Sequence, residues 1–306
     1  MRIKGVPVLL TAVALLATLA VPRAQAPAAA QDVQVRATQL APNFYALQAT
    51  GLSTVGVLTG PDGILMVDSG TAALTEKIVA AIKGISPAPI RFLINTHLHG
   101  DHTGGNANFG KMGVTLLSRD QLRMRLMKPN PGPNGAPGTP APAPALPVIT
   151  YDAPVTIHMN GEDVQLIPVR AAHTDGDTAI RFPAADVIMS GDFFRSLGYP
   201  NIDLTNGGTL QGMIDGLDQL IKAAGPATRI VPGHGEITDR AGVQAHRDIM
   251  VAVRDKVAPM VAKGMTLEQI VAAKPTAEFD AKVPGVGTTG DRFLGQLFQA
   301  LKGGAQ

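Results

Sequence analysis

The segment INTHLHGDHTGG, residues 94–105, concentrates metal-binding side chains in a chain that has only seven histidines. His97, His99, Asp101 and His102 fall within six consecutive positions. In an extended segment, residues two apart project to the same face, so His97 and His99 can present their imidazoles to one ion. Asp101 and His102 follow a turn and can face a second ion. This spacing predicts a two-metal site.

Glycines accompany this cluster at the positions where the chain has to turn. Gly100 is expected to allow a sharp turn between the two pairs of ligands. Gly104 and Gly105 are expected to leave room for close backbone approach at the start of the next helix.

Three further candidate ligands follow predicted strands, in turns rich in glycine or small residues. They are His173 in AAHTDGD, Asp192 in MSGDFF and His234 in VPGHGE. Loops of this kind can aim side chains into a cleft. Any one of them alone is more simply read as a capping or core residue, but the joint pattern favours a metal centre. The histidines at 158, in the strand VTIHM, and at 246, in a long helix, have no such partners and are interpreted as structural or surface residues.

The composition limits the chemistry and the partners. There is no cysteine, so neither a disulfide framework nor a thiolate ligand is available, and the ligands must be nitrogen and oxygen. The 26 basic and 24 acidic residues become 23 and 24 when Arg2, Lys4 and Arg23 are set aside with the first thirty residues. Such a near-neutral chain argues against a nucleic-acid partner. The partner that we expect is a small-molecule substrate.

Residues 1–30 are typical of a secretory signal peptide. Arg2 and Lys4 precede an apolar run from Val6 to Val21, and the small-residue stretch AQAPAAAQ follows. The alternative is an uncleaved membrane anchor, but the run is short against the roughly 20 residues that span a bilayer. We therefore expect a protein exported to the periplasm or secreted, without stable membrane insertion; its oligomeric state stays open.

The rest of the chain, residues 31–306, is interpreted as a single domain of two β-then-α halves. The long stretch 129–147 holds eight prolines and predicts an exposed loop, or a lid over the site. Helices are predicted to close the chain over 240–306, the first of them capped by Asp239. Strands are predicted in NFYALQA, TVGVLTG, GILMVD, IRFLINT and GVTLLS, then near 155–159, 164–169, 178–182, 187–190 and in RIVP, with helices at 71–83, just after the histidine cluster, at 119–127 and at 210–223.

THLHGDHTGG resembles the HxHxDH signature of the metallo-β-lactamase superfamily, and the order His173, Asp192, His234 resembles that family's later metal motifs. GILMVDSG, with Asp68 at a strand end, is similar to its first motif. The resemblance covers about residues 43–262.

This resemblance implies a four-layer αββα sandwich with two metal ions at the edge where two sheets meet. It implies that His97, His99 and His173 hold the first ion, that Asp101, His102 and His234 hold the second, and that Asp192 bridges both. Asp68 is then a residue that orients a ligand.

The resemblance also bears on the metal. Members with di-iron centres usually carry glutamate where this chain has His99, so zinc is favoured over iron or manganese. A bridging aspartate is more typical of the general hydrolases of the family than of established β-lactamases.

The expected activity is hydrolysis of an amide or lactam, ester or lactone, or thioester by a metal-bridging hydroxide that Asp101 helps to orient. β-Lactamase activity is one alternative, and a non-catalytic exported metal-binding or accessory protein is another. The candidate side chains at the substrate pocket are Phe193, Phe194, Tyr199 and Asn201, together with Asp203 and Asn206. The alternative is that these residues are core aromatics and turn formers.

Overall fold

The computed structural model describes residues 1, 33–49, 53–131, 136–283 and 285–303. The predicted signal peptide lies almost entirely outside the described residues. Residues 34–306 form a compact unit of their own, which contains both sheets and every candidate ligand.

Within the described residues, a seven-stranded sheet has the order β1-β2-β3-β4-β5-β6-β7. β1 to β4 pair antiparallel, whereas β4 to β7 pair parallel. Parallel neighbours require crossover connections, which the helices after β4, β5 and β6 supply. The strands are β1 (Arg36–Ala41), β2 (Phe44–Gln48), β3 (Val55–Leu58), β4 (Ile64–Val67), β5 (Ile90–Ile94), β6 (Thr115–Arg119) and β7 (Ile149–Tyr151); the connecting helices are η1 (Ala72–Leu74), α1 (Thr75–Ile85), α2 (Gly100–Thr103), α3 (Asn106–Lys111), α4 (Asp120–Met127) and η2 (Ala143–Ala145).

The second sheet, in the described part of the chain, has five strands in the order β12-β11-β10-β9-β8. Its pairs are antiparallel except β11 with β12, which are parallel and joined through α5. The remaining elements are β8 (Val155–Met159), β9 (Glu162–Pro168), β10 (Thr178–Phe182), β11 (Val187–Gly191), η3 (Leu204–Asn206), α5 (Leu210–Ala223), β12 (Arg229–Pro232), α6 (Arg240–Ala262), α7 (Leu267–Ala272), η4 (Asp280–Lys282) and α8 (Gly290–Lys302).

The four layers follow from the alternation of side chains along buried strands. All of β4 is buried, yet Ile64 and Met66 belong to the core beneath the helices, whereas Leu65 and Val67 belong to the core between the sheets. Successive side chains of a strand point to opposite faces of the sheet. A strand that is apolar on both faces must therefore be covered by other elements on both faces.

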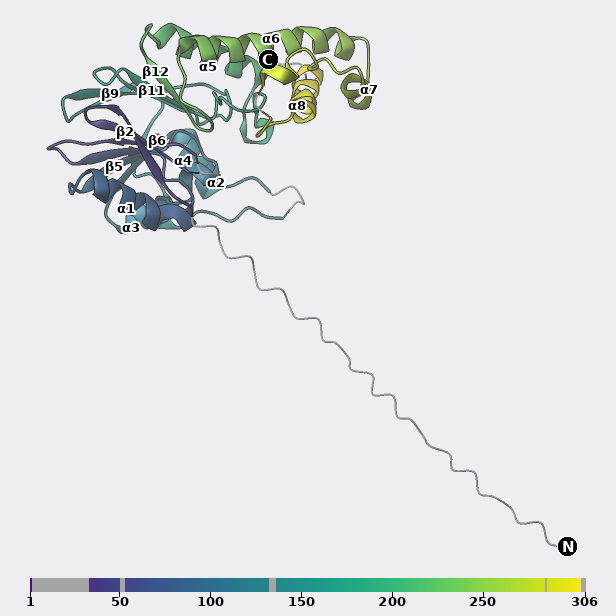
Figure 1. Ribbon diagram of the computed structural model, residues 1–306. Coiled ribbons are helices and arrows are strands. Elements are labelled where there is room, and N and C mark those ends of the chain that lie inside the picture. Colours follow the sequence, from purple (N-terminus) through teal and green to yellow (C-terminus); the bar gives the residue numbers. More distant parts are fainter. Residues whose placement is uncertain (2–32, 50–52, 132–135, 284, 304–306) are drawn as a thin grey trace. The chain divides into compact units, whose positions relative to one another are not determined.

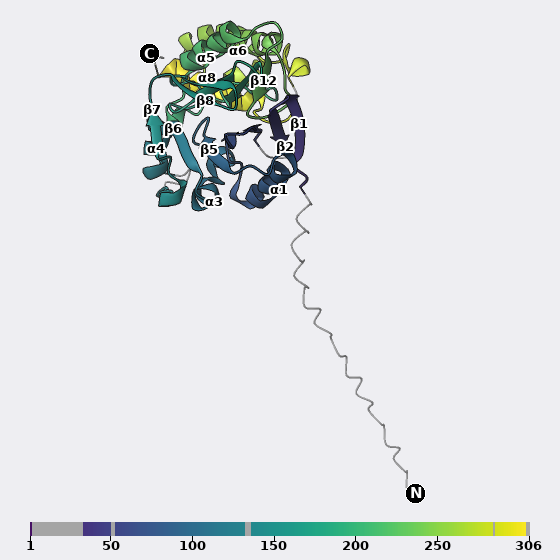
Figure 2. The ribbon, with the colours of Figure 1, turned by 90° about the vertical axis from the view of Figure 1, so that its left-hand side faces the viewer.

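Three hydrophobic clusters fill the spaces between the layers. The inner one joins the sheets, for example through Phe44 and Phe182, whose ring centroids lie 4.5 Å apart. A second packs α1 and α3 against the first sheet, and a third packs α5, α6 and α8 against the second. Figures 1 and 2 show these helices on opposite outer sides of the two sheets. The fold is therefore the expected αββα sandwich.

The predicted strands and helices are present, and the differences from prediction concern two additional edge strands and the start of one helix. Strands β1 and β7 were not predicted, and the helix expected over 71–83 begins as the 3₁₀ turn η1 before α1. Three of β1's residues and two of β7's are exposed on the sheet edges, so their apolar signal is weak. Asp239 caps α6 as predicted, accepting a hydrogen bond from the backbone N–H of Gly242.

The described residues of the proline-rich stretch are mostly exposed, as predicted, but its end packs on the domain, and residues 132–135 lie outside the described residues. Asn106 donates to the carbonyl of Ala145, and Arg123 donates to that of Pro147. Within the described ranges, no helix is both long and apolar enough to cross a membrane.

Candidate metal centre

The seven candidate ligands lie in segments that follow strands of both sheets. The cluster at 97–102 follows β5, His173 follows β9, Asp192 follows β11 and His234 follows β12. The parallel pair β11 and β12 ends at one edge, so the side chains that follow these strands emerge close together.

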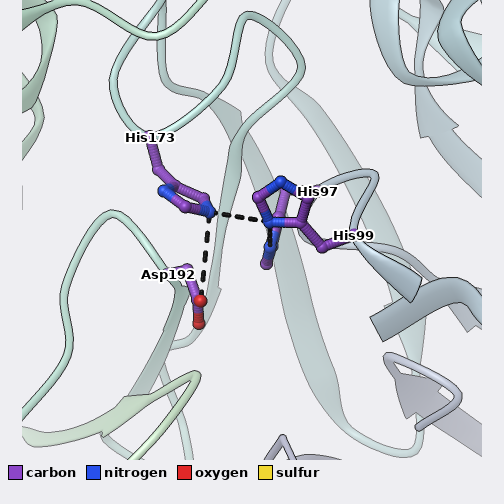
Figure 3. Close-up of side chains that lie close together, drawn as sticks. All are labelled: His97, His99, His173 and Asp192. Atoms are coloured by element: carbon purple, nitrogen blue, oxygen red, sulfur yellow. Dashed lines mark hydrogen bonds and ion pairs between the residues drawn. The ribbon is translucent and has the colours of Figure 1, made fainter. Parts of the chain in front are cut away.

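The first group consists of His97, His99, His173 and Asp192 (Figure 3). His99 Nδ1 lies 3.1 Å from Nε2 of His97 and 2.9 Å from Nε2 of His173. The Asp192 carboxylate approaches His173 Nε2 to 3.9 Å. Three imidazole nitrogens and one carboxylate therefore converge on one point.

The second group consists of Asp101, His102 and His234. Oδ2 of Asp101 lies 2.9 Å from Nε2 of His234 and 3.6 Å from Nε2 of His102. The two groups divide the ligands as the family resemblance implies.

Asp192 faces both groups. Its Oδ1 lies 3.4 Å from Nε2 of His102, and its Oδ2 lies 3.5 Å from Nε2 of His234 and 3.9 Å from Nε2 of His173. The cationic side chain of Arg195 places Nε 3.8 Å from the same Oδ2. This is the position expected of a carboxylate shared by two ions.

Asp68 anchors the outer side of the second group. Its Oδ2 accepts from Nδ1 of His102 and from the hydroxyl of Thr96, each at 2.7 Å, and its Oδ1 accepts from the Thr96 backbone N–H. Because the Thr96 hydroxyl gives its hydrogen to Asp68, it accepts from Nδ1 of His97 at 3.1 Å. One buried carboxylate thus sets the tautomer of two histidines and leaves both Nε2 atoms facing the centre.

The segment 201–203 anchors the other two histidines of the first group. Asp203 Oδ2 accepts from Nε2 of His99 at 2.7 Å, and the carbonyl of Asn201 accepts from Nδ1 of His173 at 2.7 Å. These bonds direct the unprotonated nitrogen of each ring inward. Asp203 was predicted only as a pocket residue; its partner is 104 positions away, and no local spacing rule could find the pair.

The residues present fit metal ions. Nε2 of His102 and Oδ1 of Asp192 are buried and have no hydrogen-bond partner among the described residues, an arrangement that folded proteins avoid unless something else satisfies the atoms. A tetrahedral zinc with bonds of about 2.0–2.1 Å to nitrogen separates its ligand atoms by roughly 3.3 Å, close to the spacings found here. The donor set of imidazoles and carboxylates suits zinc, and also iron or manganese.

Electrostatics keep two of the histidine ligands neutral and ready to bind a metal ion, and favour the protonated form of a third. Burial, with the nearby charge of His102, lowers the pKa of His97 well below its usual value, and burial lowers the pKa of His173 to about 4. Both rings are therefore neutral near pH 7 and offer lone pairs. Burial alone would lower the pKa of His102, but the charges of Asp68 and Asp192 raise it well above its usual value.

The two carboxylates among the ligands remain ionised. Burial alone would raise the pKa of Asp101, but the hydrogen bond from His234 and the charge of His102 lower it to about 2. Burial would likewise raise the pKa of Asp192, but the charge of His102 holds it well below its usual value.

Close backbone packing supports the histidine segment. A Cβ on Gly105 would stand 2.5 Å from the carbonyl oxygen of Ser69, and one on Gly104 would stand 2.3 Å from that of Gly100. The expected close approach at these two glycines is therefore present. Gly100 is different: it has no positive φ and its missing Cβ would meet open space, so the turn there does not depend on a glycine.

The structure also corrects the expected substrate pocket. Phe193, Phe194 and Tyr199 are buried at 1%, 1% and 4% exposure in the core beneath α5, α6 and α8, so the prediction that they form the rim is wrong. Asn201 does line a cavity, of about 260 Å³, beside His99. The aromatic side chains are core residues because the segment after Asp192 turns inward under the helices.

Two other cavities are larger, and one of them borders a candidate ligand. One of about 560 Å³ lies between Gly100 and the proline-rich stretch at Pro129 and Thr139. Another, of about 620 Å³, borders His234 and Arg195.

The two histidines interpreted as structural lie apart from the centre. His158 pairs with Asp163 at 2.7 Å on the surface. His246 sits on α6 with its ring edge-on to Phe194, at 5.4 Å between ring centroids.

Comparison with known families identifies a match. A family model described as the metallo-beta-lactamase superfamily matches residues 49–234, a range that contains all seven candidate ligands. One related protein, the type 2 metallo-beta-lactamase of Bacillus cereus, is 22% identical over 185 residues, which are 60% of this chain and 67% of that protein.

Solved structures share the fold at low sequence identity. A metallo-beta-lactamase from Pontibacter korlensis superposes with a TM-score of 0.59 at 18% identity, covering 71% of this chain and 99% of that one. The sec-alkylsulfatase Pisa1 from Pseudomonas sp. superposes with a TM-score of 0.65 at 15% identity, covering 87% of this chain and 50% of that one.

Proposed function

We propose, from the premise that this chain belongs to the metallo-β-lactamase superfamily, that it is a dinuclear, zinc-dependent hydrolase of amide or lactam, ester or lactone, or thioester bonds. The observation that carries the proposal is the position of Asp192, whose two oxygens face both ligand groups. The first ion would be held by His97, His99 and His173, the second by Asp101, His102 and His234, and both by Asp192.

Zinc bound in these groups supplies Lewis acidity and a water of near-neutral pKa. The side chains do the positioning. Asp101 stays ionised, and at 34% side-chain exposure it faces the open side of the centre, where it can accept a hydrogen bond from an attacking water. Asp68 and Thr96 hold His97 and His102 in the tautomers that keep their inner nitrogens free.

Zinc is the proposed metal because the donor set is rich in imidazole nitrogen. Apart from the shared Asp192, the two groups contain six candidate ligands. Four of these are buried or part-buried histidines whose outer ring nitrogen forms a hydrogen bond with the protein, which is typical of zinc sites. Metal analysis of the purified protein distinguishes zinc from iron or manganese.

We further propose that residues 1–30 are cleaved as a signal peptide and that the mature protein works in the periplasm or outside the cell on a small molecule. A mature chain beginning near Gln31 in extracts, found by mass spectrometry of its N-terminus, is the expected result. An intact N-terminus in a membrane fraction would instead support the anchor.

β-Lactam hydrolysis is the second candidate function. It is favoured by the relative of 22% identity, a metallo-beta-lactamase. It is disfavoured by the ligand Asp192, since a bridging aspartate is more typical of the general hydrolases of this superfamily.

One assay separates these functions. The mature protein from about Gln31, loaded with zinc, is tested against a chromogenic cephalosporin, a lactone, an aryl ester and a thioester, beside a His97→Ala control. Turnover of the ester, lactone or thioester that the control loses supports the general hydrolase, and cephalosporin turnover supports the second candidate. Two bound zinc ions with no turnover of any substrate would contradict the proposal and favour a metal-binding accessory protein.

A further inference from the structure

The cavity beside His99 has two walls of different character. The segment 201–205, which anchors His99 and His173, forms one wall. The helix α8 forms the other through Arg292, Gln296 and Gln299. The cavity of about 260 Å³ is thus built between a ligand of the first group and the C-terminal helix.

The face that α8 turns to this cavity is polar. Arg292, Gln296 and Gln299 are spaced by four and three residues, so they share one face of the helix. The opposite side chains, Phe293 and Leu297, are fully buried in the core. The helix is therefore fixed by its apolar face, and the polar face is left for the cavity.

Gln296 connects α8 to the segment 201–205 through hydrogen bonds. Its carbonyl oxygen accepts from the backbone N–H of Ile202 at 3.0 Å, and its amide donates to Oδ1 of Asn201 at 2.8 Å. The same Asn201 holds His173 through its backbone carbonyl. Hydrogen bonds through Asn201 therefore link the α8 wall of the cavity to the first ligand group.

Most acceptors in the cavity are already used. The carboxylate of Asp203 accepts from His99 and from the side-chain amide of Asn206, and the amide oxygen of Asn201 is taken by Gln296. The guanidinium of Arg292, in contrast, has no hydrogen bond or ion pair with any described residue. The group that remains available to hydrogen-bond a ligand in the cavity is therefore mainly the cationic guanidinium of Arg292.

We propose that this cavity binds an anionic arm of the substrate, namely a carboxylate, and that Arg292 is the principal partner of this carboxylate. The inference rests on the proposed function, because it takes the neighbouring ligand groups as the reaction centre. The cavity is smaller than the roughly 300–1,000 Å³ of a site that encloses a whole ligand, so it receives one arm of a substrate whose scissile bond lies at the ligand groups. A guanidinium binds a carboxylate through two parallel N–H···O bonds, which gives direction as well as affinity.

Isothermal titration calorimetry of the zinc-loaded protein tests this inference without requiring turnover. Succinate, glutarate and adipate are compared with butyrate, which has a single carboxylate to place on the metal. At the best chain length, the dicarboxylate is expected to bind about tenfold more tightly than butyrate. Arg292→Ala should abolish this preference and leave butyrate affinity unchanged, while Arg292→Lys should keep part of it.

The matched control is Arg240→Ala, which removes an exposed arginine at the start of α6 that does not line the cavity. It should behave as the wild type. The proposal is overturned if no dicarboxylate binds more tightly than butyrate, or if Arg292→Ala keeps the preference, which would assign it to the metal alone. Failure of the hydrolase proposal would appear separately, as absent turnover in the substrate assay.

Discussion

Nε2 of His99 donates to Oδ2 of Asp203 at 2.7 Å, and this bond ties the histidine cluster to a residue that follows β11 in the second sheet. It orients the ring so that Nδ1 faces His97 and His173. A metal site whose ligands come from different parts of the chain depends on such outer bonds to hold its geometry.

Replacement of Asp203 should therefore weaken the first metal site. Asp203→Asn removes the charged acceptor from His99, and loss of such a partner typically lowers metal affinity by about 10- to 100-fold. Competition with a chromogenic zinc chelator measures the change. Asp215→Asn, which alters an exposed carboxylate on α5, is the control, and equal zinc affinity in both variants would contradict the prediction.

Asp68→Ala should destabilise the fold even without metal. Asp68 is 1% exposed and accepts three hydrogen bonds, two from Thr96 and one from His102. Removing one partner of a buried charged pair costs about 3–5 kcal/mol, because the other is left without compensation. Urea unfolding of the metal-free protein measures this free energy, and a loss below about 1 kcal/mol would show that the network contributes little.

Metal removal should lower thermal stability. The ligand atoms converge only in the folded state, so ions that bind there stabilise it by mass action, by about 4 kcal/mol at a concentration 1,000 times the dissociation constant. Differential scanning calorimetry with zinc and after chelation should show a lower midpoint for the chelated protein, restored by added zinc. Equal midpoints would mean that the groups do not bind zinc in the native state.

His246 should make stability depend on pH. Burial, with the nearby charge of Arg195, lowers the pKa of His246 from 6.5 to about 4 in the folded protein. Since the unfolded chain then takes up this proton first, the contribution of the neutral ring to stability is complete above about pH 6.5 and is lost as the pH falls through about 4.

The comparison of wild type with His246→Leu isolates this effect. Relative to the variant, the wild type should lose about 2 kcal/mol of unfolding free energy between about pH 7.5 and pH 5. Urea unfolding at both pH values provides the measurement. A difference between the two proteins that does not change with pH would show that the ring is protonated as easily in the folded state as in the unfolded one.

Much of the fold and of the candidate centre could be predicted because the signals are local. Short segments of sequence are enough to recognise the HxHxDH spacing and the turns that carry His173, Asp192 and His234. The same holds for the buried strand that ends before Asp68. The alternation in β4 and the cap at Asp239 are local as well. The weak edge strands β1 and β7 escaped prediction because only part of each is buried.

The rest was decided by packing between distant segments. The sequence by itself determined the identity of the candidate ligands, because their spacing is local, and its resemblance to the family implied the αββα architecture. Only the tertiary structure decided that Phe193, Phe194 and Tyr199 belong to the core, that Asp203 holds His99, and that Arg292 reaches the cavity beside it. Those relationships join residues about a hundred or more positions apart or depend on which side a loop turns toward, and no local pattern encodes either.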